Sequence, residues 1–140
     1  MGIAKRNGGF TFVEILCAIA VIATAAMAIT YFYISSLNLS DANKEETIAM
    51  THLANMVEAI KSTPVFSNII VDFPNGDRVD VTVVGNKYGT IVGGDILKNE
   101  HITVYYVNPT SDPLEITVGV SWQDKRGVSR TRYLVTKMTR

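Results

Sequence analysis

The feature that most constrains this chain is an apolar run from Phe10 to Leu39, in which Glu14 is the only charged residue. The run exceeds the ~20 residues that an α-helix needs to cross a bilayer. A short basic segment with Lys5 and Arg6 precedes it. By the positive-inside rule, that segment stays in the cytoplasm and the rest of the chain faces outward. The sequence therefore predicts a single-pass membrane protein with a cytoplasmic N-terminus.

Two ordinary kinds of segment are alternative interpretations of this apolar run. One is a cleaved secretory signal peptide, with small-residue sites such as Ala23-Thr24-Ala25, and the other is a simple signal anchor. Glu14 argues against both, because a carboxylate among apolar residues costs roughly 2.5–3.5 kcal/mol even on the lenient insertion scale. The run also continues past the roughly 7–15 residues of a signal core. The glutamate therefore calls for a functional reason.

The residues around Glu14 suggest that reason. After the basic start come Gly9, then Phe10, and then Glu14 at the fifth position counted from Phe10. This pattern resembles the type III signal of the type IV pilin superfamily. The resemblance implies that a prepilin peptidase cuts between Gly9 and Phe10, removes residues 1–9 as a leader and methylates the new amine of Phe10. It also implies that Glu14 meets the N-terminal amine of a neighbouring subunit during assembly.

The same resemblance implies a structural role and not an enzymatic one. The expected product is a subunit of a type IV pilus or of a type II secretion pseudopilus. Its partners would be other pilin or pseudopilin subunits, the prepilin peptidase and the inner-membrane assembly platform. The protein would lie in the inner (cytoplasmic) membrane and then join an extracellular or periplasmic filament. Because Cys17 is the only cysteine, the chain lacks the cysteine pair of many major pilins, which favours a minor subunit.

A long helix is expected at the N-terminus. No proline or glycine interrupts residues 10–63, and Pro64 then disfavours helix in the residue before it. Residues 10–39 would form the transmembrane and filament-core half. Residues 40–140 would hold the amphipathic half and a globular sheet, which packs on one helical stripe. That stripe consists of Leu53, Met56, Val57 and Ile60.

The C-terminal half reads as antiparallel strands. Alternation and turn residues predict strands at 68–73, 78–84, 101–107, 114–122 and 128–137, with a hairpin joining the first two and a loop over 85–99. A helix followed by a run of strands predicts an α+β protein, with a sheet of about four to five strands as in the pilin fold.

No catalytic residue, metal ligand or cofactor site is predicted. His52 and His101 lie far apart in the sequence, and His52 is expected at the boundary of the buried stripe. Asp72, Asp77 and Asp80 cluster around the predicted hairpin turn. Their spacing matches no calcium loop, so they are interpreted as turn residues.

The last strand is basic, and Asp124 is the only nearby acid in the sequence. Arg130 and Arg132 are two residues apart and should share a strand face. The favoured interpretation is a charge row that prevents edge-to-edge pairing. In the alternative, Arg126, Arg130 and Arg132 contact a polyanion, and the chain is a DNA- or surface-binding minor pilin of a competence or adhesion filament. A formal net charge of zero does not favour nucleic acid as a partner.

Overall fold

The computed structural model describes residues 10–63, 66–83 and 85–139, and its first element is one long helix. Helix α1 spans Phe12–Lys61 and contains 50 residues. At 1.5 Å per residue it is roughly 75 Å long. The predicted single helix is therefore confirmed, and it ends three residues before Pro64.

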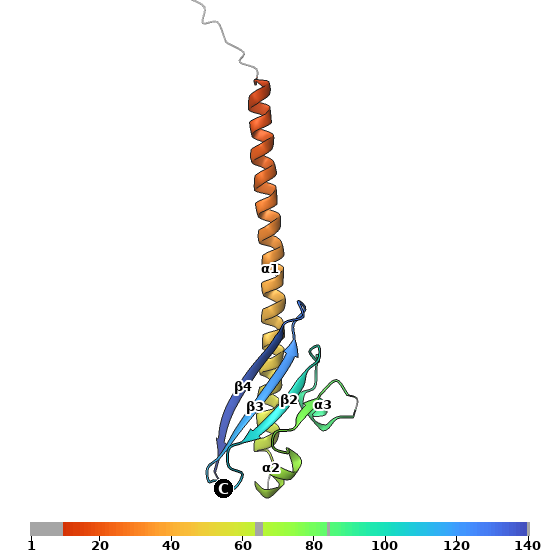
Figure 1. Cartoon of the computed structure of the whole chain (residues 1–140), viewed down its shortest axis with the longest axis vertical. Coiled ribbons are helices and arrows are strands. Elements are labelled where there is room, and N and C mark those ends of the chain that lie inside the picture. Colours follow the sequence, from red (N-terminus) through yellow and green to blue (C-terminus); the bar gives the residue numbers. More distant parts are fainter. Residues whose placement is uncertain (1–9, 64–65, 84, 140) are drawn as a thin grey trace, which may run out of the picture. The chain divides into compact units, whose positions relative to one another are not determined.

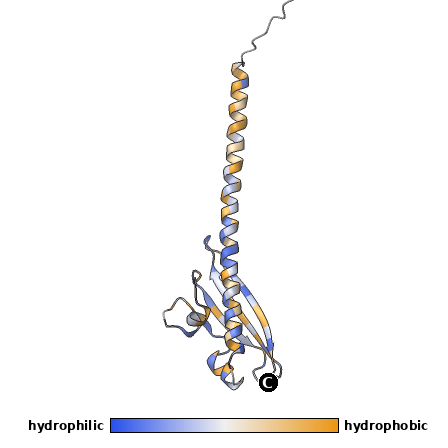
Figure 2. Ribbon diagram, turned by 180° about the vertical axis from the view of Figure 1, so that it is seen from behind, coloured by the Kyte–Doolittle hydropathy of each residue, from blue (hydrophilic) through white to orange (hydrophobic). Residues whose placement is uncertain are grey.

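The chain divides into two compact units, residues 1–40 and residues 41–140, and α1 contributes to both. In the first unit, the described side chains are exposed within the chain. Figure 2 shows apolar colour dominating this first part of α1. Among the described residues, α1 is the one helix long and apolar enough to cross a membrane. Its apolar surface thus has no cover within its own unit and needs lipid or other protein.

The second unit contains a four-stranded antiparallel sheet in the order β1-β2-β3-β4 (Figure 1). The helix and the sheet together give the predicted α+β arrangement of the pilin fold. The last three strands begin and end within one residue of the predicted bounds. The strands are β1 Arg78–Asp80, β2 His101–Tyr106, β3 Leu114–Gln123 and β4 Ser129–Met138.

The predicted hairpin is wrong. Residues 68–73 do not form a strand, because helix α2 spans Phe66–Asp72. Ile69 and Phe73, four residues apart, are both buried, which is the spacing of a helix face. The next segment pairs with β2 instead: Asn75 accepts a hydrogen bond from the Tyr106 backbone N–H at 2.9 Å, and the Gly76 N–H donates to the Val104 carbonyl at 2.8 Å.

Strand β1 is also shorter than the predicted 78–84. It ends at Asp80, where the side-chain Oδ1 accepts a hydrogen bond from the Thr82 N–H at 2.9 Å. That contact is an Asx-type turn, which takes the chain away from the sheet.

The predicted loop over 85–99 contains a short helix. Helix α3 spans Lys87–Val92, and Asn86 caps its start by accepting a hydrogen bond from the Tyr88 N–H at 2.9 Å. Gly93 ends it with a φ of 58°, a conformation that glycine adopts at little cost. Tyr88 and Val92 are buried, so α3 covers part of the core, which the predicted loop did not include.

The core lies between the second half of α1 and one face of the sheet. The predicted helix stripe of Leu53, Met56, Val57 and Ile60 is buried, as expected. The alternating residues of β3 are buried against it, also as expected, and belong to the same hydrophobic cluster. They are Leu114, Ile116, Val118, Val120 and Trp122.

Candidate assembly site

The start of α1 carries a reciprocal hydrogen-bonded cap. Thr11 immediately precedes the helix, and its hydroxyl accepts from the Glu14 N–H at 3.3 Å. In return, the Thr11 N–H donates to Glu14 Oε2 at 3.2 Å, and the Thr11 hydroxyl lies 3.4 Å from the same oxygen. This is the capping box of Ser or Thr followed three residues later by Glu. Glu14 therefore stabilises the first turn of its own helix.

The two oxygens of Glu14 differ in their environments. Oε2 takes both contacts from Thr11, whereas Oε1 makes no hydrogen bond or ion pair within the described part of the chain. The neighbouring Phe10 and Val13 side chains are exposed and apolar. The site thus offers one free carboxylate oxygen in an apolar surface, which suits a single cationic partner from another molecule.

Sequence reasoning identified Glu14 and missed Thr11, although the spacing of a threonine three residues before a glutamate is itself a readable signal of a helix start. Phe10 lies directly before the cap and is exposed. Gly9 and the predicted leader lie outside the described residues.

The match to a family model covers this segment. Residues 4–30 match the prokaryotic N-terminal methylation motif, the signal of type IV prepilins. The chain is therefore type IV pilin-like at its N-terminus. No curated protein and no solved structure matches the chain.

The pilin-like signal and the apolar part of α1 together fit a membrane-anchored, single-pass protein. Two separate observations support this: the motif match supports the resemblance to pilins, and the length and composition of α1 support the membrane segment. Prepilins assemble with other pilins after processing at this signal, so the signal also indicates a structural protein.

Arg130 and Arg132 of β4 share one face of the strand, as their spacing predicted. Arg130 and Arg132 lie opposite Trp122 and Val120 of β3. Directly opposite residues share a sheet face, and both of these β3 residues are buried. The two arginines therefore lie on the face of the sheet that packs on α1.

All three candidate arginines contact carboxylates of the chain. Arg132 pairs with Glu46 of α1 at 2.8 Å, a partner that sequence reasoning missed because it is 86 residues away. Arg130 and Arg126 lie 3.1 Å and 3.8 Å from Asp124. These carboxylates compete with any polyanion for the guanidinium groups, and the predicted polyanion contact stays a prediction.

The same contacts perturb the pKa values of the acids. The Val128 backbone N–H and then the Arg130 side chain, which both hydrogen-bond the carboxylate, lower the pKa of Asp124. The Arg132 hydrogen bond lowers the pKa of Glu46 and raises that of Arg132 itself. In each case the interaction favours the charged form.

His52 is not the boundary residue that was expected. It is 2% exposed, and its Nδ1 lies 2.6 Å from Oε1 of Glu100, which is fully buried. The second oxygen of Glu100 accepts a hydrogen bond from the Leu97 N–H at 2.8 Å. This pair connects α1 to the residue before β2, so it serves the fold and is far in sequence from the assembly end.

The acids near the predicted turn have separate partners. Asp72 pairs with Lys87 at 3.1 Å, and Asp80 receives the Thr82 hydroxyl and N–H, which lower the pKa of Asp80. Within the described ranges, no three His, Cys, Asp or Glu side chains are grouped as metal ligands.

Proposed function

We propose that this chain is a minor structural subunit of a type IV pilus or a type II secretion pseudopilus, with no catalytic activity of its own. The observation that supports it most directly is the methylation-motif match over residues 4–30, which contains Gly9, Phe10 and Glu14. A prepilin peptidase cuts after Gly9, and the new amine of Phe10 is methylated. The protein waits in the inner membrane and then enters an extracellular or periplasmic filament.

Glu14 gives the proposed assembly step its register. A lone carboxylate in an apolar environment is costly, and so is a lone amine, but the pair is tolerated when the two meet. The free Oε1 of Glu14 would accept the Phe10 amine of the neighbouring subunit while Oε2 keeps its bonds to Thr11. The stagger that joins amine and carboxylate is thus favoured over other staggers of two apolar helices.

The processing step is tested by the intact mass of the mature protein from its native host. The expected chain begins at Phe10 and carries one added methyl group. A chain that begins at Ala26 or Ile29 would indicate an ordinary signal peptidase and would overturn the proposal. A Gly9→Leu variant should retain its leader.

The assembly step is tested by Glu14→Gln. Glutamine can take the place of glutamate in a capping box, so this variant keeps the start of the helix and removes only the charge. We expect normal leader removal, a normal amount of protein in the membrane and loss of the subunit from sheared filaments, measured by immunoblot. The Glu14→Ala variant should fail in the same way.

Glu58→Gln is the matched control, because Glu58 is an exposed glutamate on the same helix and its side chain makes no hydrogen bond or ion pair with the described residues. It should enter filaments as the unaltered chain does. Normal filament content of Glu14→Gln would remove the role assigned to the charge.

A further inference from the structure

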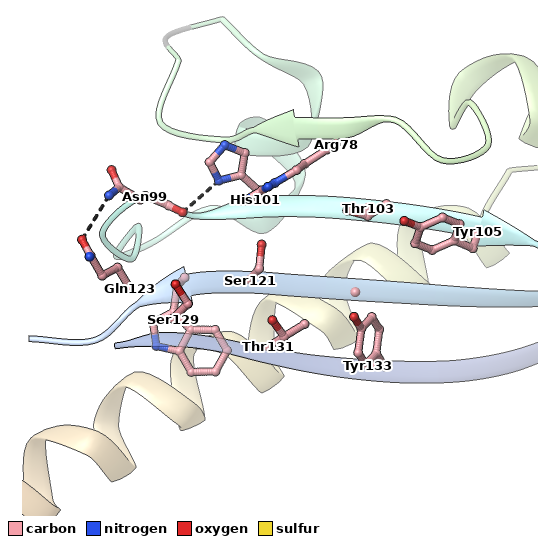
Figure 3. Close-up of a pocket in the computed structure, with 12 residues that line it drawn as sticks. Arg78, Asn99, His101, Thr103, Tyr105, Ser121, Gln123, Ser129, Thr131 and Tyr133 are labelled. Atoms are coloured by element: carbon pink, nitrogen blue, oxygen red, sulfur yellow. Dashed lines mark hydrogen bonds between the residues drawn. The ribbon is translucent and has the colours of Figure 1, made fainter. Parts of the chain in front are cut away.

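An open groove of about 600 Å³ lies on the sheet face opposite α1 (Figure 3). Thr103 and Tyr105 of β2 line it, and they alternate with the buried residues Ile102, Val104 and Tyr106. The groove therefore belongs to the solvent face of the sheet and lies wholly within the second unit.

The floor of the groove is set by a glycine and a tyrosine. Gly119 of β3 lies opposite Tyr133 of β4, and a Cβ at Gly119 would lie 2.8 Å from Tyr133 Cε1. Only glycine lets the Tyr133 ring lie this close across β3. Tyr133 remains 62% exposed and Tyr105 48% exposed, so two aromatic rings are presented on an open face.

Neutral hydrogen-bonding side chains surround these rings. Thr103, Ser121 and Thr131 line the groove, and their hydroxyls make no hydrogen bond with the residues that the structure describes. At one end, the Asn99 side-chain amide donates to Gln123 at 3.2 Å (Figure 3). The lining is thus rich in hydroxyl and amide groups and poor in charge.

One cation in the groove lacks a partner. Arg78 is exposed and makes no ion pair with the described residues. The acid within β1 is Asp80, which already accepts two hydrogen bonds from Thr82 and lies 4.0 Å from His101. The groove therefore offers a single guanidinium to a ligand.

From these features we infer that the groove binds an oligosaccharide that carries carboxylate groups. The C–H faces of sugar rings would pack on Tyr105 and Tyr133, and sugar hydroxyls would bond to the free hydroxyl and amide side chains. Arg78 would take the carboxylate in a charge-assisted, two-bonded contact. The volume lies within the ~300–1,000 Å³ of ordinary ligand sites. This inference concerns the second unit alone and does not depend on the proposed assembly function.

Two other ligand classes fit the groove less well. An added peptide strand pairs with backbone groups at a sheet edge, here the outer edges of β1 and β4, whereas the groove lies on the face of the sheet. A nucleic acid binds through several phosphate contacts, and only Arg78 is an unpaired Lys or Arg among the residues that line the groove.

The test uses the full-length chain in detergent micelles, applied to a glycan array that includes uronic-acid and sialic-acid oligosaccharides. Binding of oligogalacturonate is then titrated beside a neutral galactan of the same length. We expect saturable binding of the acidic probe, weakened about tenfold by Arg78→Gln and abolished by Tyr133→Ala. Lys61→Gln is the matched control, since Lys61 is exposed and lies outside the groove, and it should bind as the unaltered chain does.

The emission of Trp122, the only tryptophan, checks that each variant is folded. Three results would overturn the inference: no acidic glycan is retained, Tyr133→Ala and Arg78→Gln bind as tightly as the unaltered chain, or single-stranded DNA binds instead with a steep salt dependence.

Discussion

The buried pair of His52 and Glu100 gives the sharpest prediction about stability. His52→Leu would leave the Glu100 carboxylate, which has no exposed surface, with only the Leu97 N–H as a partner. Breaking a buried pair by removing one member costs about 3–5 kcal/mol, because an uncompensated charge remains. That is a large part of the ~5–15 kcal/mol that stabilises an ordinary domain.

Two further variants separate the charge from the hydrogen bonds. Glu100→Gln keeps the shape, an acceptor for Leu97 and a donor for His52, so it should cost about 1 kcal/mol or less. The double variant His52→Leu with Glu100→Leu removes the charge altogether. It loses the acceptor of the Leu97 N–H and should cost about 1–3 kcal/mol. The double variant is therefore expected to be more stable than His52→Leu alone.

Urea unfolding of the full-length chain in detergent micelles measures these differences. Trp122 is buried at the sheet face that packs on α1, so its fluorescence reports on the second unit and not on the membrane segment. The reasoning is refuted if the free energy of unfolding of His52→Leu lies within about 1 kcal/mol of that of the unaltered chain, or if the double variant is the least stable of the set.

Four other changes test the core and its charges by the same urea assay. Ile60→Ala, at a fully buried position, should cost about 2–5 kcal/mol. Tyr106→Phe should cost about 1 kcal/mol, because the Tyr106 hydroxyl donates to the Phe73 carbonyl at 2.9 Å. Tyr88→Phe should cost nothing, because the Tyr88 hydroxyl has no partner among the described residues; burial raises its pKa to about 12. Folding lowers the pKa of Asp124 from its ordinary 3.8. The stability that Asp124 contributes is therefore present above pH 3.8 and is lost as the pH falls through its pKa in the folded protein. Asp124→Asn should remove this part of the loss of stability in acid.

Local signals explain what the sequence predicted correctly. The long helix follows from the absence of proline and glycine before Pro64 and from a stripe with helical period. Strand β3 follows from strict alternation, and the expected inward residues are buried. Gly119 is the exception, since it belongs to the outward set but is buried beneath the Tyr133 ring. The alternation of a strand predicts which face of the sheet a residue occupies, but not which side chain of a neighbouring strand covers it.

The errors arose where intrinsic preference and tertiary context disagreed. Residues 68–73 include Ile69, Ile70 and Val71, which are β-branched and favour strands. The protein instead buries Ile69 and Phe73 together, and Asn75 bonds to the backbone of β2 in the position that a paired strand would need. Burial outweighed a preference that amounts to at most ~1 kcal/mol.

Sequence separation decides which polar contacts could be foreseen. The Thr11–Glu14 cap spans three residues and is readable from spacing alone, whereas the Glu46–Arg132 pair spans 86 residues and the His52–Glu100 pair spans 48. Long-range pairs depend on how helix and sheet dock, which no local pattern encodes. The motif match likewise ends at residue 30, within the segment that must meet the peptidase and other subunits. Whatever distinguishes this chain from others with the same signal must therefore lie beyond residue 30, and the tyrosine-lined groove of the second unit is one such feature.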